Sequence, residues 1–400
     1  MTKIFFFLLV VCLQNLNAQS LLFEGKIIDK TTQEAIPFTN IYILDSTQGV
    51  VCNEEGVFKF FIPKDAKTIE ISHLGYKSIN LDVSKIEPKF ATILMEADEM
   101  ALEEVIVTNK PINELLSKIV ENSKLQLDKS IKLETYYREF VKINQKHSKF
   151  SDGLIDFYLK PKRKTKIEAN LIVNQSRAFQ LAKKEELEAE GTLDLSELGS
   201  FFDIQTAANG FFSFELDKIT SKKNSKNYDF ELRSKKDAEG NTIETIYITP
   251  KSNVKEVLLE GKVSYDPEKK IILDIDLKMS ETHKQYVEMV NVLIMKFAIH
   301  DIQIKQTYKL ANGKYIPSYR KSIADIHIKF GKKMDDRFMC ISDLVVTNFF
   351  DNLENYPAEE TFFKEKDLYS NGMNYTEKFW ETNNIMPLSS SEEQVLKSLK

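Results

Sequence analysis

The chain has 400 residues, of which 42% are hydrophobic and 29% charged, with 27 Phe and only 13 Gly. This composition excludes collagen-like, low-complexity and disordered proteins, and it is typical of a globular protein with room for two or three domains. The formal net charge of −5 provides no overall basic field, which argues against a nucleic-acid partner.

Residues 1–18 have the three parts of a secretory signal peptide. Lys3 supplies a short positive region, residues 4–13 form an unbroken apolar run, and residues 14–18 are polar and end on the small residue Ala18, after which cleavage is expected. The apolar run is too short to span a bilayer, and no later run reaches the roughly 18 residues required. We therefore expect an exported chain without a transmembrane helix, located in the periplasm or associated with the outer membrane.

Residues 21–97 are dense in short β-strand signals separated by turns. Ile69 and Ile71 alternate with polar residues, Leu81 and Val83 do the same, and Pro63 marks a turn. Roughly seven short strands in a stretch of this length predict a seven-stranded β-sandwich.

The same stretch resembles the carboxypeptidase-regulatory-like domain, a transthyretin-like sandwich common in exported proteins of Bacteroidetes. The resemblance rests on four motifs in a fixed order, namely Gly25-x-Ile27-x-Asp29, Ile36-Pro37-x-x-Asn40-Ile41-x-Ile43, Gly56-x-Phe58-x-Phe60 and Ile71-Ser72-His73-Leu74-Gly75-Tyr76. One departure is Cys52-Asn53, where the family usually has Thr-Asp before the Gly-x-Phe strand. The resemblance implies an accessory sandwich and an interaction module.

The family name does not imply peptidase activity for this chain. A zinc carboxypeptidase needs a His-x-x-Glu pair and a further distant His to hold its metal. The five histidines are His73, His147, His283, His300 and His327, and none of them has Glu at the third position after it. We therefore expect no catalytic residues, no cofactor and no metal.

Residues 98–110 are expected to be a linker between two blocks. The segment Leu102-Glu103-Glu104-Val105-Ile106-Val107-Thr108 resembles the one that follows this sandwich in TonB-dependent receptors. A 22-stranded receptor barrel needs on the order of 220 strand residues before any plug or loops, so a full receptor does not fit in the rest of the chain.

Residues 111–388 are expected to form an antiparallel-sheet domain. Leu115, Leu116 and Ile119 recur at helical spacing after Pro111, and the pattern then changes to strands of alternating polarity. The turn at residues 266–268 predicts a hairpin between two such strands. One apolar and one charged face fit a large sheet covered on one side, and the order of elements resembles the open half-barrel of lipoprotein-carrier-like proteins. Residues 389–400 are expected to form a C-terminal helix. The predicted fold class is thus mainly β, a sandwich followed by an α+β domain with packed helices.

Residues 176–214 are predicted to be a helical insertion in this sheet. They contain an aromatic group that consists of Phe201, Phe202, Phe211 and Phe212. One interpretation is a mobile apolar lid over a cavity for a lipid or another apolar ligand. The other is a pair of core helices that close the open face of the sheet.

Two functions are compatible with these features. The first is a non-catalytic envelope protein, in which the sandwich is an interaction module and the sheet binds an apolar ligand or an envelope protein partner. The alternative is a hydrolase whose site is assembled from residues distant in the sequence. A histidine, a nucleophile and a carboxylate converging in one pocket would favour the hydrolase, and a dry apolar cavity would favour the binding protein.

Overall fold

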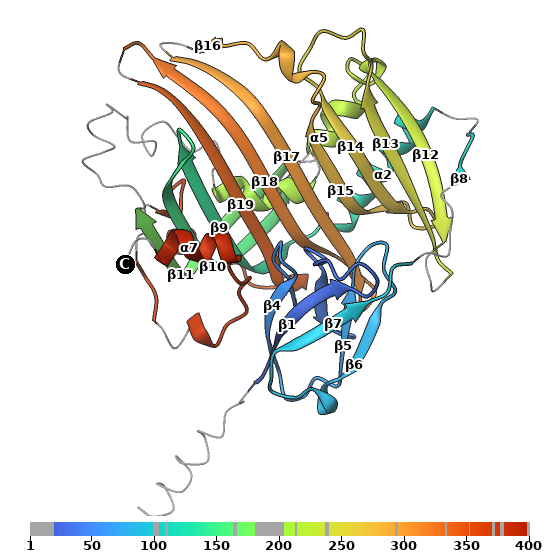
Figure 1. Ribbon diagram of the computed structural model, residues 1–400, viewed down its shortest axis with the longest axis vertical. Helices are drawn as coiled ribbons and strands as arrows, with labels where there is room; N and C mark the ends of the chain where they lie inside the picture. Colours follow the sequence, from blue (N-terminus) through green and yellow to red (C-terminus); the bar gives the residue numbers. More distant parts are fainter. Residues whose placement is uncertain are drawn as a thin grey trace, which may run out of the picture.

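The computed structural model describes residues 20–98, 104–108, 111–162, 166–180, 204–212, 214–236, 240–292, 295–332, 334–351, 353–369, 373–376 and 380–397. Figure 1 shows a small N-terminal β unit at one end of a long curved sheet. The strands of the first unit come from residues 21–95, and those of the curved sheet come from residues 104–351.

The N-terminal unit is a sandwich of two sheets. One sheet has the order β4-β1-β7 and the other the order β3-β2-β5-β6, and β1 pairs in parallel only with β7. The strands are β1 (Leu21–Asp29), β2 (Asn40–Ile43), β3 (Gly49–Val51), β4 (Val57–Ile62), β5 (Thr68–Ser72), β6 (Ile79–Asp82) and β7 (Ala91–Met95). The predicted seven-stranded sandwich is confirmed.

Alternation along the strands builds the core of this sandwich. In β1 every second residue is buried, and Phe23 and Ile27 pack against Phe58 and Phe60 of β4. The first motif glycine is needed because β1 and β7 lie very close together. A Cβ atom on Gly25 would lie 2.2 Å from the carbonyl oxygen of Ala91.

The second unit is one open antiparallel sheet of twelve strands. Its order is β11-β10-β9-β19-β18-β17-β15-β14-β13-β12-β8, and β16 pairs with β17 beside this path. The strands are β8 (Glu104–Val105), β9 (Ile131–Ile143), β10 (Lys146–Lys162), β11 (Lys166–Gln180), β12 (Tyr228–Lys236), β13 (Thr242–Pro250), β14 (Leu259–Asp266), β15 (Ile271–Met279), β16 (Val290–Val292), β17 (Met295–Ala311), β18 (Lys314–Phe330) and β19 (Met334–Asp351). The mainly β fold with a large antiparallel sheet is confirmed.

The predicted hairpin joins β14 to β15. The Asp266 carboxylate accepts hydrogen bonds from the backbone N–H groups of Glu268 and Lys269, both at 2.9 Å. This side chain therefore closes the turn that the sequence indicated at residues 266–268.

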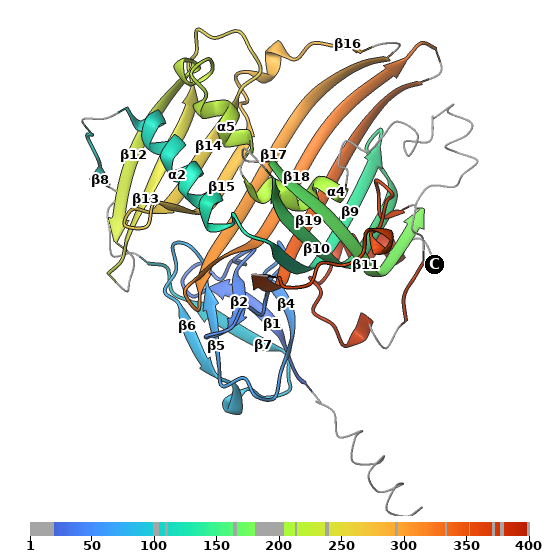
Figure 2. The same cartoon turned by 180° about the vertical axis from the view of Figure 1, so that it is seen from behind.

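Helices cover one face of the sheet, which we call the inner face (Figure 2). They are α2 (Ile112–Gln126), α4 (Ile204–Ala207), the 3-10 turn η2 (Ala208–Phe212) and α5 (Phe214–Thr220). Helix α2 buries Leu116, Ile119 and Val120 against β12, β15 and α5. The inner face therefore contains the main apolar core.

The sandwich packs on the opposite face, the outer face, at the ends of β17, β18 and β19. Tyr308 and Lys309 are consecutive in β17, so their side chains point to opposite faces. The Tyr308 hydroxyl donates to the backbone oxygen of Phe211 in η2 at 2.6 Å, whereas the Lys309 ammonium lies 4.6 Å from the ring centre of Tyr42 in the sandwich. Phe38 stacks on Tyr319 of β18 at 4.8 Å. The expectation of a sheet covered on one side only is thus wrong at this end.

A C-terminal segment, residues 380–397, covers a further part of the outer face. It ends in helix α7 (Ser390–Lys397) and lies beside the sandwich. The Asn53 side-chain amide donates to the backbone oxygens of Pro387 and Leu388 at 3.3 and 3.2 Å. The Ser390 backbone N–H donates to Glu55 at 3.0 Å.

Under this segment lies a buried network of charged groups. Arg138 of β9 is 1% exposed and donates to Asp343 of β19 at 2.7 Å. The Arg138 guanidinium also lies 3.0 Å from Glu392 of α7. The Tyr319 hydroxyl donates to the second oxygen of Asp343 at 2.5 Å. Each buried charge thus has a partner on another element.

Two predicted boundaries differ from the structure. Residues 176–180 belong to β11, because they continue its pairing with residues 149–153 of β10, so the helical insertion predicted from residue 176 begins later. Part of the insertion, residues 181–203, lies outside the described residues. Within the predicted linker, Glu104 and Val105 form β8, which pairs with β12.

The remaining 3-10 turns are η1 (Val83–Lys85), η3 (Ser225–Asn227), η4 (Lys284–Tyr286) and η5 (Glu359–Thr361). None of the helices in the described ranges combines the length and the apolar character of a membrane span. Cys52 and Cys340 are both free thiols.

Candidate functional site

The aromatic group predicted from the sequence is only partly described. Phe211 and Phe212 lie in η2 on the inner face, and both are buried in the main core. Gln306 of β17 donates to the backbone oxygen of Gly210 at 2.9 Å, which helps to fix η2 on the sheet. Phe201 and Phe202 lie outside the described residues. The lid stays a prediction, and the described half occupies the position that the core interpretation expects.

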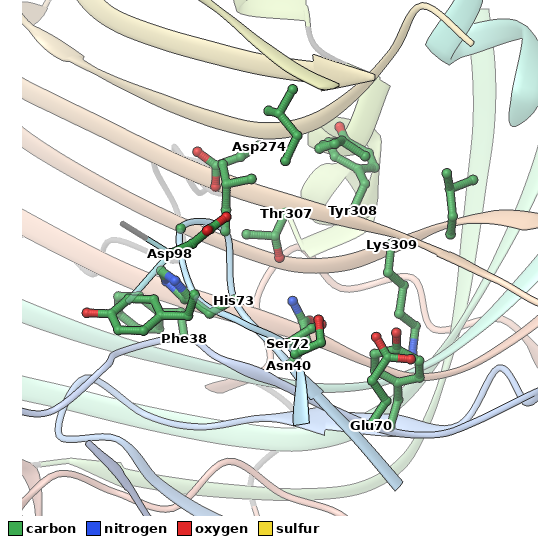
Figure 3. A pocket seen from close by; sticks show the side chains of 18 of the residues that line it. Phe38, Asn40, Glu70, Ser72, His73, Asp98, Asp274, Thr307, Tyr308 and Lys309 are labelled. Carbon is green, nitrogen blue, oxygen red and sulfur yellow. The ribbon is translucent and has the colours of Figure 1, made fainter. Parts of the chain in front are cut away.

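A cleft lies on the outer face, where the sandwich meets the sheet. It has a volume of about 350 Å³, and both units line it. Figure 3 shows His73, Asp98, Asp274 and Thr307 at one end of this cleft and Glu70 and Lys309 at the other. We call it the junction cleft.

Polar rows that cross several strands form the sheet wall of the junction cleft. Register places Thr245, Ser264, Asp274 and Thr307 opposite one another on β13, β14, β15 and β17. Cross-strand partners share a face, so this row lies on the outer face beneath the sandwich. A second row on the same face brings together Lys262, Asp276 and Lys305.

The sandwich wall is the segment between β5 and β6 that contains the motif His73-Leu74-Gly75-Tyr76. The Tyr76 N–H donates to the His73 oxygen at 3.1 Å, and Gly75 has φ +94°, a conformation that glycine adopts without strain. The Asp98 N–H donates to the Gly75 oxygen at 2.9 Å. This turn therefore fixes both His73 and Asp98 at the edge of the cleft.

Burial and positive charge determine the electrostatics of this end. Burial, followed by the ammonium groups of Lys305, Lys262 and Lys235, lowers the pKa of His73 to about 4. Burial raises the pKa of Asp274, and Lys305, whose ammonium lies 3.9 Å from this carboxylate, opposes that effect. At neutral pH the imidazole of His73 is therefore uncharged.

The other end of the cleft holds Lys309, a buried ammonium. Burial lowers the pKa of Lys309 to about 8, and the carboxylate of Glu70 opposes this effect. The Lys309 ammonium donates to the Thr47 backbone oxygen at 3.5 Å. This lysine therefore contacts the sandwich and contributes to docking.

Three polar atoms of the cleft have no hydrogen-bond partner. They are Nδ1 of His73, Oδ1 of Asp98 and Oγ1 of Thr307. Only eight buried side-chain polar atoms in the described ranges lack a partner, and three of these eight lie in this one cleft. A buried polar group without a partner costs roughly 1–3 kcal/mol, which makes the cleft a place where a ligand's polar groups are favoured.

The described residues contain no group of three or more His, Cys, Asp or Glu side chains arranged to hold a metal ion.

The sequence did not point to this cleft. His73 is part of a family motif and lacks the Glu that a zinc pair needs, and the alternation of β15 indicates only that Asp274 lies on the charged face of the sheet. The strand alternation that sets Ser264, Asp274 and Thr307 on one face was visible, but which strands are neighbours was not. That the sandwich covers this face was also not visible.

The comparisons with known proteins identify the N-terminal unit. Residues 23–107 match the family model of the CarboxypepD_reg-like domain. Among proteins with curated descriptions, none matches this chain.

Solved structures show a weak similarity. A DUF1329 family protein from Desulfovibrio piger ATCC 29098 is 9% identical with a TM-score of 0.23, and the match covers 62% of this chain and 96% of that one. Lipovitellin, from a structure titled for its lipid–protein interactions, is 11% identical with a TM-score of 0.22, over 57% of this chain and 26% of that one. Scores of this size support no argument about function. The match of residues 23–107 to the CarboxypepD_reg-like model confirms the resemblance that the four motifs indicated.

Proposed function

We propose that this chain is a non-catalytic protein of the cell envelope that binds a small ligand in the junction cleft. Export rests on the signal-peptide pattern of residues 1–18, and the mature protein is placed in the periplasm or at the outer membrane. The sandwich is the interaction module, because it supplies one wall of the cleft while the sheet supplies the other.

The observation that supports this proposal is the set of unpartnered atoms. Nδ1 of His73 and Oδ1 of Asp98 come from the sandwich side, and Oγ1 of Thr307 comes from the sheet. Buried polar groups without a protein partner are uncommon, and a bound ligand, ion or water is the usual reason for them. A ligand that bonds all three atoms would also hold the two units together.

The cleft has an apolar portion as well. Phe38, Tyr42 and Leu273 line it together with the polar groups. Ligand sites commonly combine apolar walls with a few polar groups that fix orientation. The expected ligand was apolar, whereas this lining favours a ligand with both an apolar and a polar part.

Binding fits the cleft better than hydrolysis does. His73 and Thr307 are a base and a hydroxyl in one cleft, but neither Nδ1 of His73 nor Oγ1 of Thr307 has a partner, so these two atoms are not bonded to each other. A general base must also accept a proton, and three lysines oppose a positive charge on His73. The hydrolase remains the alternative proposal.

Native mass spectrometry of protein purified from its own envelope fraction tests the proposal. We expect a co-purifying small molecule that is lost in Thr307→Val, which removes one hydroxyl and keeps the side-chain shape. Thr249→Val is the matched control, because Thr249 is an exposed threonine of β13. A ligand retained equally by both variants would place it elsewhere, and an empty protein from a functional envelope would contradict the proposal.

Export has a separate test. The amino terminus of the protein recovered from the envelope should be Gln19. An unprocessed Met1 in a protein recovered from the cytoplasm would contradict the location and leave the binding site untouched.

A further inference from the structure

We infer that the ligand of the junction cleft contains an anionic group, a carboxylate or a phosphate, which binds among Lys235, Lys262 and Lys305 beside His73. The inference rests on the proposed binding function and adds the chemical class of the ligand. Three features of the cleft support it.

The first feature is a set of three half-buried lysines at one end of the cleft. Lys235 and Lys262 are half-buried and form no ion pair with any described residue, and Lys305 is 3.9 Å from Asp274, close to the limit for an ion pair. The Lys235 ammonium reaches within 3.9 Å of the point where Gly75 would place a Cβ atom. It therefore extends from β12 across to the turn that holds His73. Asp276 shares a row with Lys262 and Lys305, but no described carboxylate pairs with the ammonium groups of Lys235 and Lys262, and these two charges attract an anion.

The second feature is His73 itself. Its Nδ1 is buried without a partner, and the charges that act on the ring are those of Lys305, Lys262 and Lys235. An anion at this point would accept a hydrogen bond from the imidazole and would offset the three positive charges. The same site that disfavours a cation on His73 therefore favours an anion next to it.

The third feature narrows the ligand further. Of the carboxylates that line the cleft, Asp274 faces Lys305 and Glu70 lies with Lys309 at the far end, whereas Oδ1 of Asp98 has no partner. A carboxylate oxygen needs a donor. We therefore infer an organic anion with a hydroxyl or an amine near its charged group, since such a donor can bond Oδ1 of Asp98 while the anionic oxygens face the lysines.

Glycerol 3-phosphate is a suitable probe, since it has a phosphate next to two hydroxyls. The mature full-length protein is titrated with glycerol 3-phosphate, with inorganic phosphate and with glycerol at low salt. Binding is followed by calorimetry and by the NMR signals of the His73 ring, which His73→Gln identifies among the five histidines. We expect glycerol 3-phosphate to bind most tightly, inorganic phosphate less tightly, and glycerol not to bind, with the His73 signals moving on saturation.

Lysine variants locate the anion. Lys235→Met and Lys262→Met should each weaken the binding of glycerol 3-phosphate by about tenfold, because each removes one charged contact. Lys278→Met is the matched control and should not change the affinity. Lys278 is on the same strand as Asp274, pairs with Glu260 at 3.7 Å and does not line the cleft.

The anionic group could come from a free metabolite or from a lipid headgroup, and a competition experiment separates the two. Vesicles of phosphatidylcholine with added phosphatidic acid are compared with vesicles of phosphatidylcholine alone. Displacement of glycerol 3-phosphate by the acidic vesicles only would assign a lipid headgroup. An absence of displacement would assign a soluble anion. Both results support the anionic class.

Two results would overturn the inference. One is an affinity for glycerol 3-phosphate that the lysine variants leave unchanged, and the other is no movement of the His73 signals at saturating probe. If the co-purified ligand proves uncharged while Thr307→Val still loses it, the anionic class alone fails and the binding function stands.

Discussion

The inner and outer faces of the large sheet are covered in opposite ways. On the inner face, helix α2 buries Leu116 and Ile119 in an apolar core that also includes Phe211. On the outer face, the sandwich and the C-terminal segment cover Arg138 and Asp343 and enclose the junction cleft. Apolar burial depends little on direction, whereas buried charges need partners at defined positions. The inner face thus provides stability, and the outer face specifies how the two units dock.

Removal of one buried charge should produce the largest effect. Arg138→Met leaves Asp343 buried without its cation, so we expect the free energy of unfolding to fall by about 3–5 kcal/mol. Urea denaturation followed by circular dichroism measures this loss. Lys30→Met removes an exposed partner of Glu96 and should leave the midpoint unchanged. Equal urea midpoints for Arg138→Met and Lys30→Met would show that the buried charge network of Arg138 and Asp343 does not specify how the two units dock.

The pH dependence of stability should report on the cleft. The pKa of His73 is lowered to about 4 in the folded protein from an ordinary value near 6.5. Between these two values the unfolded chain binds a proton that the folded protein does not. The stability that the uncharged His73 contributes is therefore complete above pH 6.5. As the pH falls towards 4, the free energy of unfolding decreases by roughly 1–3 kcal/mol. The free energy of unfolding of wild type minus that of His73→Gln, measured from pH 4 to 6.5, gives the contribution of His73. If this difference does not change with pH, the lowered pKa of His73 is contradicted.

Two matched substitutions test the docking of the C-terminal segment. The Asn53 amide donates to the segment, whereas Oδ1 of Asn384 accepts a hydrogen bond from the N–H of Phe61 at 2.8 Å. Asp keeps an acceptor but cannot donate. Asn53→Asp should cost about 1–2 kcal/mol and speed proteolysis within residues 380–397, whereas Asn384→Asp should have little effect. An equal loss of stability in both variants would mean that the added negative charge, and not the lost amide donor of Asn53, weakens the docking of the segment.

The smallest effect should be a gain in stability. Thr307→Val removes an unpartnered buried hydroxyl and keeps the β-branched shape, so the ligand-free protein should gain about 1 kcal/mol. Thermal unfolding with and without the co-purified ligand measures this change. A loss of stability in the ligand-free protein would show that Oγ1 of Thr307 has a partner in solution.

The sequence predicted best where structure depends on neighbouring residues. The sandwich follows from strand alternation and motif order, as in β1, where burial alternates from Phe23 to Asp29. The β14–β15 hairpin follows from the Asp266 turn. Both are short-range patterns, and tertiary contacts reinforce them.

The cleft could not be predicted because it depends on contacts between distant parts of the chain. Asp274 has the position of a water-facing residue in an alternating strand, but it is buried in the cleft whose other wall is the sandwich turn at residues 73–76. Asn53 shows that a departure from the family pattern can indicate a tertiary contact. The family's usual Asp could accept the same two turn hydrogen bonds from Glu55 and Val57, and only the amide also donates to Pro387 and Leu388.

The contact between Glu55 and Ser390 joins residues that are 335 positions apart. A folding chain can complete the sandwich from its own first hundred residues, since these contacts are local, but this docking contact must wait until residue 390 has been made and brought back. The sandwich can therefore fold before this docking contact forms, and its docking surface is exposed during that interval. Chaperones that act on exported chains could bind this surface until the C-terminal segment covers it.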